Sequence, residues 1–472
     1  MATYTCDQSL TVSGQTRRAF LQNATTAGLA LAVVGAPALA APSAKADYTL
    51  RIAPTSFEVA PGKIIQTVGY NGAVPGPLIR VREGKQVTIK VINDSSVPDL
   101  VHWHGLKIPS LVDGAMEEGT PMIMPGAQAS YTFTPNPAGT RWYHSHATAK
   151  DDLRLSLYGG QYGFLYVEPK HDPGRYDQEV FIAMHQWEPS FVSMQDFHRG
   201  PPPDNGLEVA YKSASFNSKA LGHGEPVRVR RGQRVLFRLL NASATDDIAL
   251  ALPGHQFTVV ALDGNPVPAP QSVDMLVLAP AERIDALVEM NNPGVWVFGS
   301  VKDDERASGM GIVIEYANSS GEAQWRPMEK SAMPMWDYLK FGANTPVREP
   351  DRRFELLSQK ILGGRGGFNR WTINGKSWPD TDPLMVERGK RYRLVFNNDS
   401  GDMHPMHLHR HSFELVKFDG KSTSGIIKDV VNVPARKTVE VDFVADNPGL
   451  TLLHCHMQEH MDFGFMNLVK YI

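Results

Sequence analysis

Short runs rich in Val, Ile, Thr and Phe alternate with polar residues along most of this 472-residue chain. Such period-two runs, bounded by turn residues, predict β-strands with one buried face. Gly, Pro, Asn and Asp separate the runs, and long amphipathic helical patterns are scarce. We therefore predict an all-β fold built from Greek-key β-sandwiches.

One short segment occurs three times, as V-R-E-G-K at 81–85, V-R-R-G-Q at 229–233 and V-E-R-G-K at 386–390. An apolar strand follows each copy and ends at Asn93, Asn241 or Asn397. Further along, strands opened by Pro125, Pro280 and Pro434 end in Asn-Pro turns before Gly139, Gly294 and Gly449. Self-similarity on this scale predicts three homologous domains. The predicted organisation is a signal at 1–46, domains at 47–169, 170–317 and 351–472, and a connecting segment at 318–350.

The first 46 residues have a different pattern. Arg17 and Arg18 precede an apolar, Ala-rich run that ends in A-L-A at 38–40 or A-K-A at 44–46. This pattern is typical of a twin-arginine export signal, and it predicts passage through the twin-arginine translocase to the periplasm or the exterior. The run is too short to span a bilayer, so stable membrane insertion is not expected.

Removal of this signal changes the formal net charge from −3 to −5 and removes Cys6, which leaves Cys455 as the only cysteine. A single cysteine in an oxidising compartment has no internal disulfide partner, which favours metal ligation. The balanced charge gives no indication of nucleic-acid binding.

Ten of the sixteen histidines lie in four short clusters. The clusters are H-W-H at 102–104, H-S-H at 144–146, H-P-M-H-L-H at 404–409 and H-C-H-M-Q-E-H at 454–460. His102 and His104 follow Gly84 at the same distances as His407 and His409 follow Gly389; His144 and His146 follow Gly139 as His454 and His456 follow Gly449. The middle repeat has Leu250, Leu252, Gly299 and Val301 at these offsets. We predict one metal site with eight histidines, shared by domains 1 and 3, and no ligand from domain 2.

Each repeated pair is His-x-His, and residues i and i+2 of a strand point to the same face. In His454-Cys455-His456 the histidines therefore face the shared site, whereas Cys455 faces the other side. There it can meet His404 and His460, and two imidazoles with one thiolate are the ligands of a blue-copper electron-transfer site. The offsets place Asp99 and Asp247 in the position of His404, and Ser145 and Ser300 in that of Cys455.

With these motifs the chain resembles three-domain multicopper oxidases of the laccase type, over nearly all of 47–472. The resemblance implies cupredoxin-like domains and four coppers. It assigns His102 and His407 to the type 2 copper, His104, His144 and His456 to one type 3 copper, and His146, His409 and His454 to the other. Cys455, His404 and His460 would hold the type 1 copper, where a small-molecule or Cu(I) reductant gives single electrons, and O2 would be reduced to water at the shared cluster.

Three positions depart from the family pattern or bear on proton supply. The axial position of the type 1 site is Phe465 instead of a thioether, and Met466 should face away, so we expect a high potential. Asp113 resembles the acidic residue that relatives place near the type 2 copper, where it would orient water or supply protons; an ordinary Asp-Gly turn is the alternative. Many bacterial relatives have an acidic residue directly after the last type 1 histidine, but this chain has Met461, followed by Asp462.

Several residues beside the ligands have less specific interpretations. Met403, Met406, Met457, Met461 and Met466 are interpreted as packing residues, with guidance of Cu(I) as the alternative. The other histidines are expected to be ordinary surface or core residues: His171, His185, His198, His223, His255 and His411.

The favoured function is an exported, laccase-like oxidase of phenols or related aromatic donors. The first alternative, a cuprous oxidase for copper tolerance, has the same copper ligands and differs in substrate access. The second alternative is a nonenzymatic, division-associated scaffold, which would lack the ligands. A two-domain nitrite reductase is disfavoured because the second set of type 3 copper ligands would have no function in such an enzyme.

Overall fold

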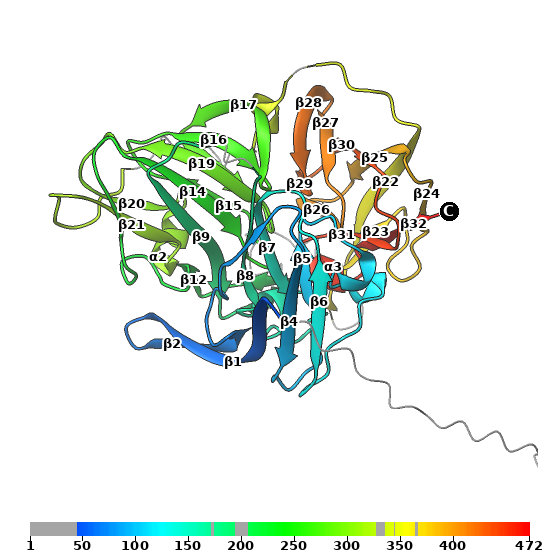
Figure 1. Ribbon diagram of the computed structural model, residues 1–472, viewed down its shortest axis with the longest axis horizontal. Helices are drawn as coiled ribbons and strands as arrows, with labels where there is room; N and C mark the ends of the chain where they lie inside the picture. The colour runs from blue at the N-terminus through cyan, green and yellow to red at the C-terminus, as the bar shows by residue number, and fades with distance from the viewer. Residues whose placement is uncertain (1–44, 171–173, 194–205, 327–335, 344, 364–366) are drawn as a thin grey trace, which may run out of the picture. The chain divides into compact units, whose positions relative to one another are not determined.

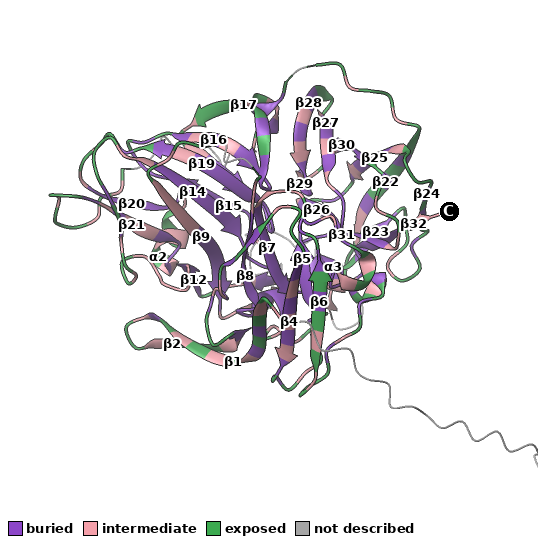
Figure 2. Ribbon diagram, in the orientation of Figure 1, coloured by how far each residue is buried: buried purple, intermediate pink, exposed green. Residues whose placement is uncertain are grey.

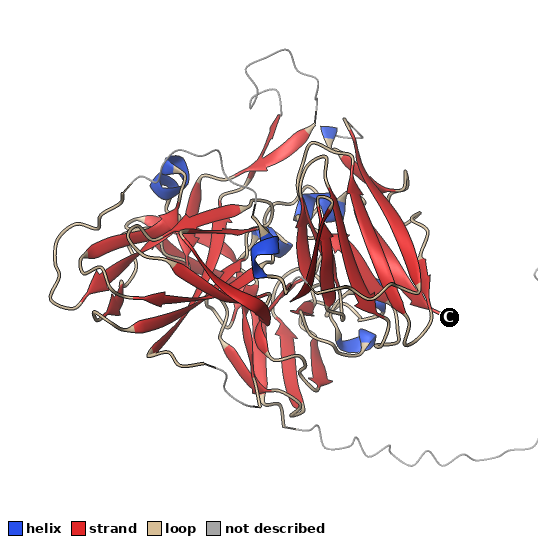
Figure 3. Ribbon diagram, turned by 90° about the horizontal axis from the view of Figure 1, so that it is seen from above, coloured by secondary structure: helices blue, strands red, loops and turns tan. Residues whose placement is uncertain are grey.

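The computed structural model describes residues 45–170, 174–193, 206–326, 336–343, 345–363 and 367–472 (Figure 1). The predicted export signal lies outside the described residues except for 45 and 46, as do His171, His198 and part of the predicted connecting segment. In the described ranges, no helix has both the length and the apolar character needed to cross a membrane. Strands dominate, with a few short helices at their ends (Figure 3), which confirms the all-β prediction.

The strands up to residue 168 form two four-stranded sheets. They are β1 (Tyr48–Ala60), β2 (Lys63–Tyr70), β3 (Ile79–Arg82), β4 (Val87–Asn93), β5 (Val101–His104), β6 (Gln128–Phe133), β7 (Gly139–Ser145) and β8 (Tyr162–Glu168). The sheet orders are β2-β1-β4-β6 and β3-β8-β7-β5. The 3-10 helices are η1 (Ser110–Val112), η2 (Met116–Glu118) and η3 (Ser156–Tyr158).

The next strands form a six-stranded sheet, a five-stranded sheet and a small hairpin. They are β9 (Gln178–Trp187), β10 (Ser190–Ser193), β11 (Leu207–Ala210), β12 (Ser213–Phe216), β13 (Val227–Val229), β14 (Arg234–Asn241), β15 (Ile248–Ala251), β16 (Phe257–Leu262), β17 (Asn265–Val273), β18 (Met275–Leu278), β19 (Arg283–Glu289), β20 (Val295–Ser300) and β21 (Gly311–Tyr316), with helix α2 (Asp303–Ser308). The sheet orders are β12-β9-β14-β19-β16-β17, β13-β21-β20-β15-β18 and β10-β11.

The last strands repeat this arrangement after the 3-10 helix η4 (Tyr338–Phe341). They are β22 (Arg352–Ile361), β23 (Arg370–Ile373), β24 (Leu384–Val386), β25 (Arg391–Asn398), β26 (His404–Leu408), β27 (Phe413–Phe418), β28 (Lys421–Lys428), β29 (Val430–Val433), β30 (Thr438–Val444), β31 (Thr451–Cys455) and β32 (Met466–Tyr471), with helix α3 (Gln458–Asp462). The sheet orders are β23-β22-β25-β30-β27-β28 and β24-β32-β31-β26-β29. Nearly every residue of β14, β26 and β31 is buried (Figure 2).

A buried asparagine ends the matching strand of each repeat. Asn93 and Asn241 donate from Nδ2 to carbonyls of the loop that follows and accept from the backbone amides of Ser95 and Ser243. In the third repeat Asn398 makes these bonds, so the prediction of Asn397 was wrong by one residue. Asn397 and Asn398 are neighbours of the same residue type. Only Asn398 follows Gly389 at the distance at which Asn93 follows Gly84 and Asn241 follows Gly232.

The middle repeat is out of register by one residue in β15. Leu250 pairs with Ser300, whereas Met406 pairs with Cys455 and Val101 with Ser145. One extra residue therefore lies between Asn241 and β15. The residues equivalent to His404, His407 and His409 are then Ile248, Ala251 and Pro253, which corrects the assignments of Asp247, Leu250 and Leu252. Domain 2 still has no histidine in these positions.

Candidate metal centres

Two strand pairs bring the eight repeated histidines together. His102 on β5 pairs with His144 on β7, and His407 on β26 pairs with His454 on β31. Because side chains two apart share a face, each pair turns its imidazoles toward the other domain. The rings of His102 and His409 stack with centroids 4.0 Å apart, and those of His104 and His407 stack at 3.8 Å. Trp103, between the first two histidines, packs into the hydrophobic core instead.

Short distances join the imidazoles within each of the three sets that the resemblance implies. The same imidazoles also form other groups of three, such as His102 with His104 and His144, and His102 with His407 and His409. Nε2 of His102 lies 3.4 Å from Nε2 of His407. In a second set the ring centroids of His104 and His144 lie 5.6 Å apart. The ring centroid of His456 lies 5.1 Å from each of them. In the third, one donor atom from each of His146, His409 and His454 lies within 4.8 Å of the others.

The donor chemistry of this site fits metal ions. Burial lowers the pKa of His104, His144, His146, His407, His409, His454 and His456 well below the ordinary value, so these imidazoles stay neutral, as ligands must be. Both ring nitrogens of His456 and Nε2 of His146 are buried without a hydrogen-bond partner among the described residues. Buried polar atoms without partners are costly, and a metal ion would remove that cost.

Hydrogen bonds fix which nitrogen of each imidazole faces the site. Nδ1 of His144 and Nδ1 of His454 donate to the carbonyls of Ser145 and Cys455, over 2.8 and 2.9 Å. Nδ1 of His409 lies 2.8 Å from Oδ2 of Asp113. Such bonds hold the ring and leave Nε2 for the metal.

Asp113 is a buried carboxylate at the shared site. Its backbone carbonyl lies 2.9 Å from Nδ1 of His102, and its Oδ1 has no partner among the described side chains. Glu118, which belongs to no motif in the sequence, also lies at the shared site. Its Oε1 lies 3.5 Å from Nδ1 of His409 and accepts from the backbone amide of Leu452. Burial and the nearby Asp113 raise the pKa of Glu118 well above the ordinary value. Met461 packs with Ala115 and Leu452 and supplies no acidic group here.

Cys455, His404 and His460 form a separate, buried set in domain 3. Sγ of Cys455 lies 3.8 Å from Nδ1 of His404 and 3.4 Å from Nδ1 of His460, and the two Nδ1 atoms are 3.2 Å apart. Ser400 Oγ lies 2.8 Å from Nε2 of His404 and fixes that ring. Burial raises the pKa of the Cys455 thiol and lowers the pKa of His404 to about 3. Because a bound metal ion deprotonates a coordinating thiol, this trigonal set fits copper.

Phe465 lies against this set, and Met466 does not. The ring of Phe465 meets that of His404 edge to face at 4.8 Å. Met466 packs in another cluster, with Ala115 and Leu452. The alternation along the strand thus gives the arrangement expected from the sequence.

Replacement of Phe465 by methionine is expected to lower the reduction potential of a copper held by the Cys455 set, because a thioether beside that set would stabilise the oxidised metal. A tenfold change in the one-electron equilibrium is about 59 mV, and we expect a shift of at least that size. Mediated redox titration of the blue absorption would measure it. Met466→Leu is the control and should leave the potential unchanged; an unchanged potential in Phe465→Met would contradict the axial assignment.

In domain 1 a hydrogen bond occupies the place that the Cys455 set has in domain 3. Ser145 Oγ, the counterpart of Cys455, donates to Asp99 Oδ1, the counterpart of His404, over 2.7 Å. Gln161 also donates to Asp99. This polar pair explains how the same fold is completed without a metal ligand.

His255 and His411 make the same structural contacts in domains 2 and 3. Nε2 of His255 lies 2.6 Å from the hydroxyl of Tyr316, and Nε2 of His411 lies 2.8 Å from that of Tyr471. Each Nδ1 faces a carbonyl two residues earlier. His185 is likewise buried and hydrogen-bonded to the Leu157 carbonyl, so these three histidines have structural contacts.

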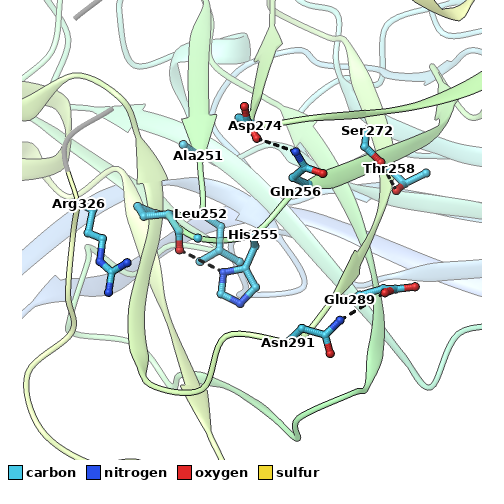
Figure 4. Close-up of a pocket in the computed structure, with 12 residues that line it drawn as sticks. Ala251, Leu252, His255, Gln256, Thr258, Ser272, Asp274, Glu289, Asn291 and Arg326 are labelled. Atoms are coloured by element: carbon cyan, nitrogen blue, oxygen red, sulfur yellow. Dashed lines mark hydrogen bonds between the residues drawn. The ribbon is translucent and has the colours of Figure 1, made fainter. Parts of the chain in front are cut away.

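A cavity of about 610 Å³ lies in domain 2 and is larger than the pocket at His460 (Figure 4). Six of its polar side chains form pairs: Gln256 with Asp274, Thr258 with Ser272, and Asn291 with Glu289. The guanidinium of Arg326 lies over the Trp296 ring at 4.8 Å. His255, at its edge, is hydrogen-bonded on both nitrogens. The cavity therefore offers no reactive group.

Comparison with known proteins identifies the class. Three multicopper oxidase family models match residues 52–172, 188–315 and 357–471. The chain is 30% identical to multicopper oxidase MmcO of Mycobacterium tuberculosis over 94% of its own length and 91% of the relative's. It therefore belongs to the multicopper oxidase family, and it is a copper-dependent oxidoreductase that uses O2.

Two further relatives extend this comparison. Copper resistance protein A of Pseudomonas syringae pv. tomato is 24% identical, over 97% of this chain and 99% of that protein. The crystal structure of a multicopper oxidase from Pseudomonas thermotolerans superposes with a TM-score of 0.70 and 26% identity, over 90% of this chain and all of that one.

Proposed function

We propose that this chain holds four coppers and oxidises a small donor at the His460 edge of the Cys455 site. The type 2 and type 3 coppers would be held by the eight histidines in the three sets described above, and the type 1 copper by Cys455, His404 and His460. Bound copper supplies one-electron transfer at the Cys455 site and reduction of O2 to water at the shared site. Four electrons and four protons are needed for each O2.

The protein places the two sites one residue apart. Cys455 faces the donor side, and its neighbours His454 and His456 face the shared site. Electrons thus have a covalent path along one tripeptide. Asp113, buried beside His102 and His409, is proposed to orient water and pass protons during O2 reduction.

The observation that favours a metal-cation donor is the pocket at His460, with a volume of about 410 Å³. Its wall has five carboxylates, two thioethers and one lysine: Glu208, Asp246, Asp247, Asp402, Glu459, Met403, Met457 and Lys302. Lys302 is paired with Glu305 at 2.6 Å, and Lys360 is paired with Glu208 and Asp402, at 2.8 and 3.3 Å. Oδ1 of Asp247 and Oε1 of Glu459 are buried without partners among the described residues.

Burial raises the pKa of Asp247 to about 8 and the pKa of Glu459 well above the ordinary value, so these two groups would lose their protons when a cation binds. Deprotonated carboxyl groups attract a cation, and thioethers are soft ligands that suit Cu(I). We therefore propose Cu(I) as the preferred donor, which agrees with the name of the relative copper resistance protein A. This preference reverses the order expected from the sequence, which placed phenols first.

Aromatic donors are the second candidate because a neighbouring pocket of about 280 Å³ shares Asp247 and Met403 with the first. Its wall includes Trp336, Tyr338 and Phe418. A phenol bound there would lie next to Met403, the residue before His404, but would not touch His460.

Steady-state oxidation of Cu(I) and of a dimethoxyphenol, the latter without added Cu(II), tests this proposal. We expect Asp247→Asn to raise KM for Cu(I) about tenfold, which corresponds to about 1.4 kcal/mol, and to change phenol oxidation little. Asp274→Asn, in the domain 2 cavity, is the matched control and should change neither. If Asp247→Asn leaves Cu(I) kinetics intact and impairs phenol oxidation, the aromatic candidate replaces the cuprous one.

We also propose that residues 1–46 direct twin-arginine export, which fits a chain that acquires its metal before translocation. Replacement of Arg17 and Arg18 by lysine should retain the protein in the cytoplasm, as measured by fractionation. Export of that variant at the normal level would contradict this proposal.

A further inference from the structure

Asp429, just before β29, touches two histidines of the shared site that belong to different domains. Its Oδ1 lies 3.1 Å from Nε2 of His104, and its backbone carbonyl lies 2.7 Å from Nδ1 of His407. These bonds leave Nδ1 of His104 and Nε2 of His407 facing the shared site. Nδ1 of His104 lies 3.4 Å from Nε2 of His144, and Nε2 of His407 lies 3.4 Å from Nε2 of His102. One residue of domain 3 thus fixes the donor nitrogen of a ligand in each of two domains.

Domain 2 in turn holds this carboxylate. Arg283 donates from Nη1 to Oδ1 of Asp429 over 2.7 Å and from Nη2 to Oδ2 over 2.6 Å. Arg141 of domain 1 adds a bond of 3.3 Å to Oδ2. The side chains of all three residues are at most 1% exposed. Such bidentate, buried pairs are strong and fix the plane of the carboxylate.

The glycine after His104 makes room for this contact. Gly105 has φ of +83°, and a Cβ there would lie 2.7 Å from Asp429 Oδ2 and 2.8 Å from Arg283 Nη2. The backbone of the ligand strand therefore rests directly on the ion pair. Asp263 of domain 2 secures the other side, where its Oδ2 accepts from the backbone amide of Val430 over 3.1 Å.

Asp113 and Asp429 are related but differ in one respect. Asp113 comes from domain 1 and contacts His102 and His409, whereas Asp429 comes from domain 3 and contacts His104 and His407. Asp113 has an oxygen without a partner among the described residues, but both oxygens of Asp429 are bound by arginine.

We propose that Asp429 and Arg283 are positioning residues for the shared copper site, and that domain 2, which has no ligand, acts on that site through Arg283. This inference rests on the proposed copper assignment. Carboxylates that orient a metal-binding histidine and raise its basicity contribute substantially to metal affinity. Loss of the negative charge would weaken the donor strength of His104 and remove the carboxylate that both buried arginines share.

The test uses the mature protein, loaded with copper and then dialysed against a chelator. We expect Asp429→Asn to bind the shared-site coppers about 10- to 100-fold more weakly, so that about one copper per chain and the blue absorption remain. The type 2 signal in electron paramagnetic resonance should shift or disappear. Arg283→Lys, which keeps the charge but not the bidentate geometry, should give a smaller loss.

Asp285→Asn is the matched control. Asp285 is also buried and paired with an arginine, since Arg238 donates to it over 2.5 Å, and Thr140 donates to it over 2.7 Å; it makes no bond to a histidine among the described residues. This variant should keep all its coppers.

Three outcomes decide the inference. Full copper retention with an unchanged type 2 signal in Asp429→Asn would overturn it, as would an equal loss in Asp285→Asn. If Asp429→Asn does not fold, Arg283→Lys must show the selective loss, and its absence overturns the proposal. A wild-type protein that binds no copper would instead contradict the copper assignment itself.

Discussion

Cys455→Ser is expected to abolish the blue absorption and to reduce donor oxidation to the level of the protein without copper. Serine is nearly isosteric, but a hydroxyl is a hard and weakly acidic ligand that does not replace a thiolate. Sγ of Cys455 lies 3.4 Å from Nδ1 of His460, and the backbone joins Cys455 directly to His454 and His456. The loss should be in electron transfer, because the eight histidines of the shared site are unchanged. Absorption spectroscopy, copper counting and steady-state oxidation would measure it.

Ser145→Ala is the matched control for this variant, because Ser145 has the same repeat position in domain 1 and likewise lies between two ligands. It should keep the blue absorption, the copper content and most of the activity. A Cys455→Ser protein that retained the blue absorption would show that the thiolate is not its origin.

The sequence predicted the contacts that depend on strand alternation and on the internal repeat. His-x-His in equivalent strands predicted which side chains face the shared site, and the structure brings those residues together. Counting from the repeat glycine failed in the middle repeat, where the chain has one extra residue between Asn241 and β15. That residue shifts the offsets of the positions in β15, and no sequence motif marks it. The pairing of Leu250 with Ser300 reveals this shift, and strand pairing cannot be read from one sequence.

The residues around the ligands were less predictable. Arg283 begins a strand of the internal repeat, but the matching positions of the other two repeats are Gln128 and Lys437. Glu118 lies in η2, and both residues come close to the shared site only in the folded chain. The pocket at His460 is similar, because its carboxylates come from four separate segments of domains 2 and 3. Residues of this kind do not recur at a regular spacing along the chain, so a periodic pattern does not indicate them.

Asp113→Asn is expected to slow O2 reduction by about 100- to 10,000-fold, the range typical of a lost general acid or base. Asparagine keeps the shape and can still accept from Nδ1 of His409, so copper content should persist. The donor should still reduce the Cys455 site normally. Stopped-flow spectroscopy should therefore show normal bleaching of the blue absorption by donor and slow recovery when O2 is added.

Glu118 sharpens this prediction because its carboxyl group faces that of Asp113, and each group has one oxygen without a partner among the described residues. If the two carboxyl groups act as one relay, Glu118→Gln should also slow recovery, and the double variant should be no slower than the slower single variant. Glu117→Gln, the adjacent and half-buried carboxylate, is the control and should recover normally. Additive losses would mean that Asp113 and Glu118 pass protons independently, and normal recovery in Asp113→Asn would leave Asp113 as a turn residue that holds His409.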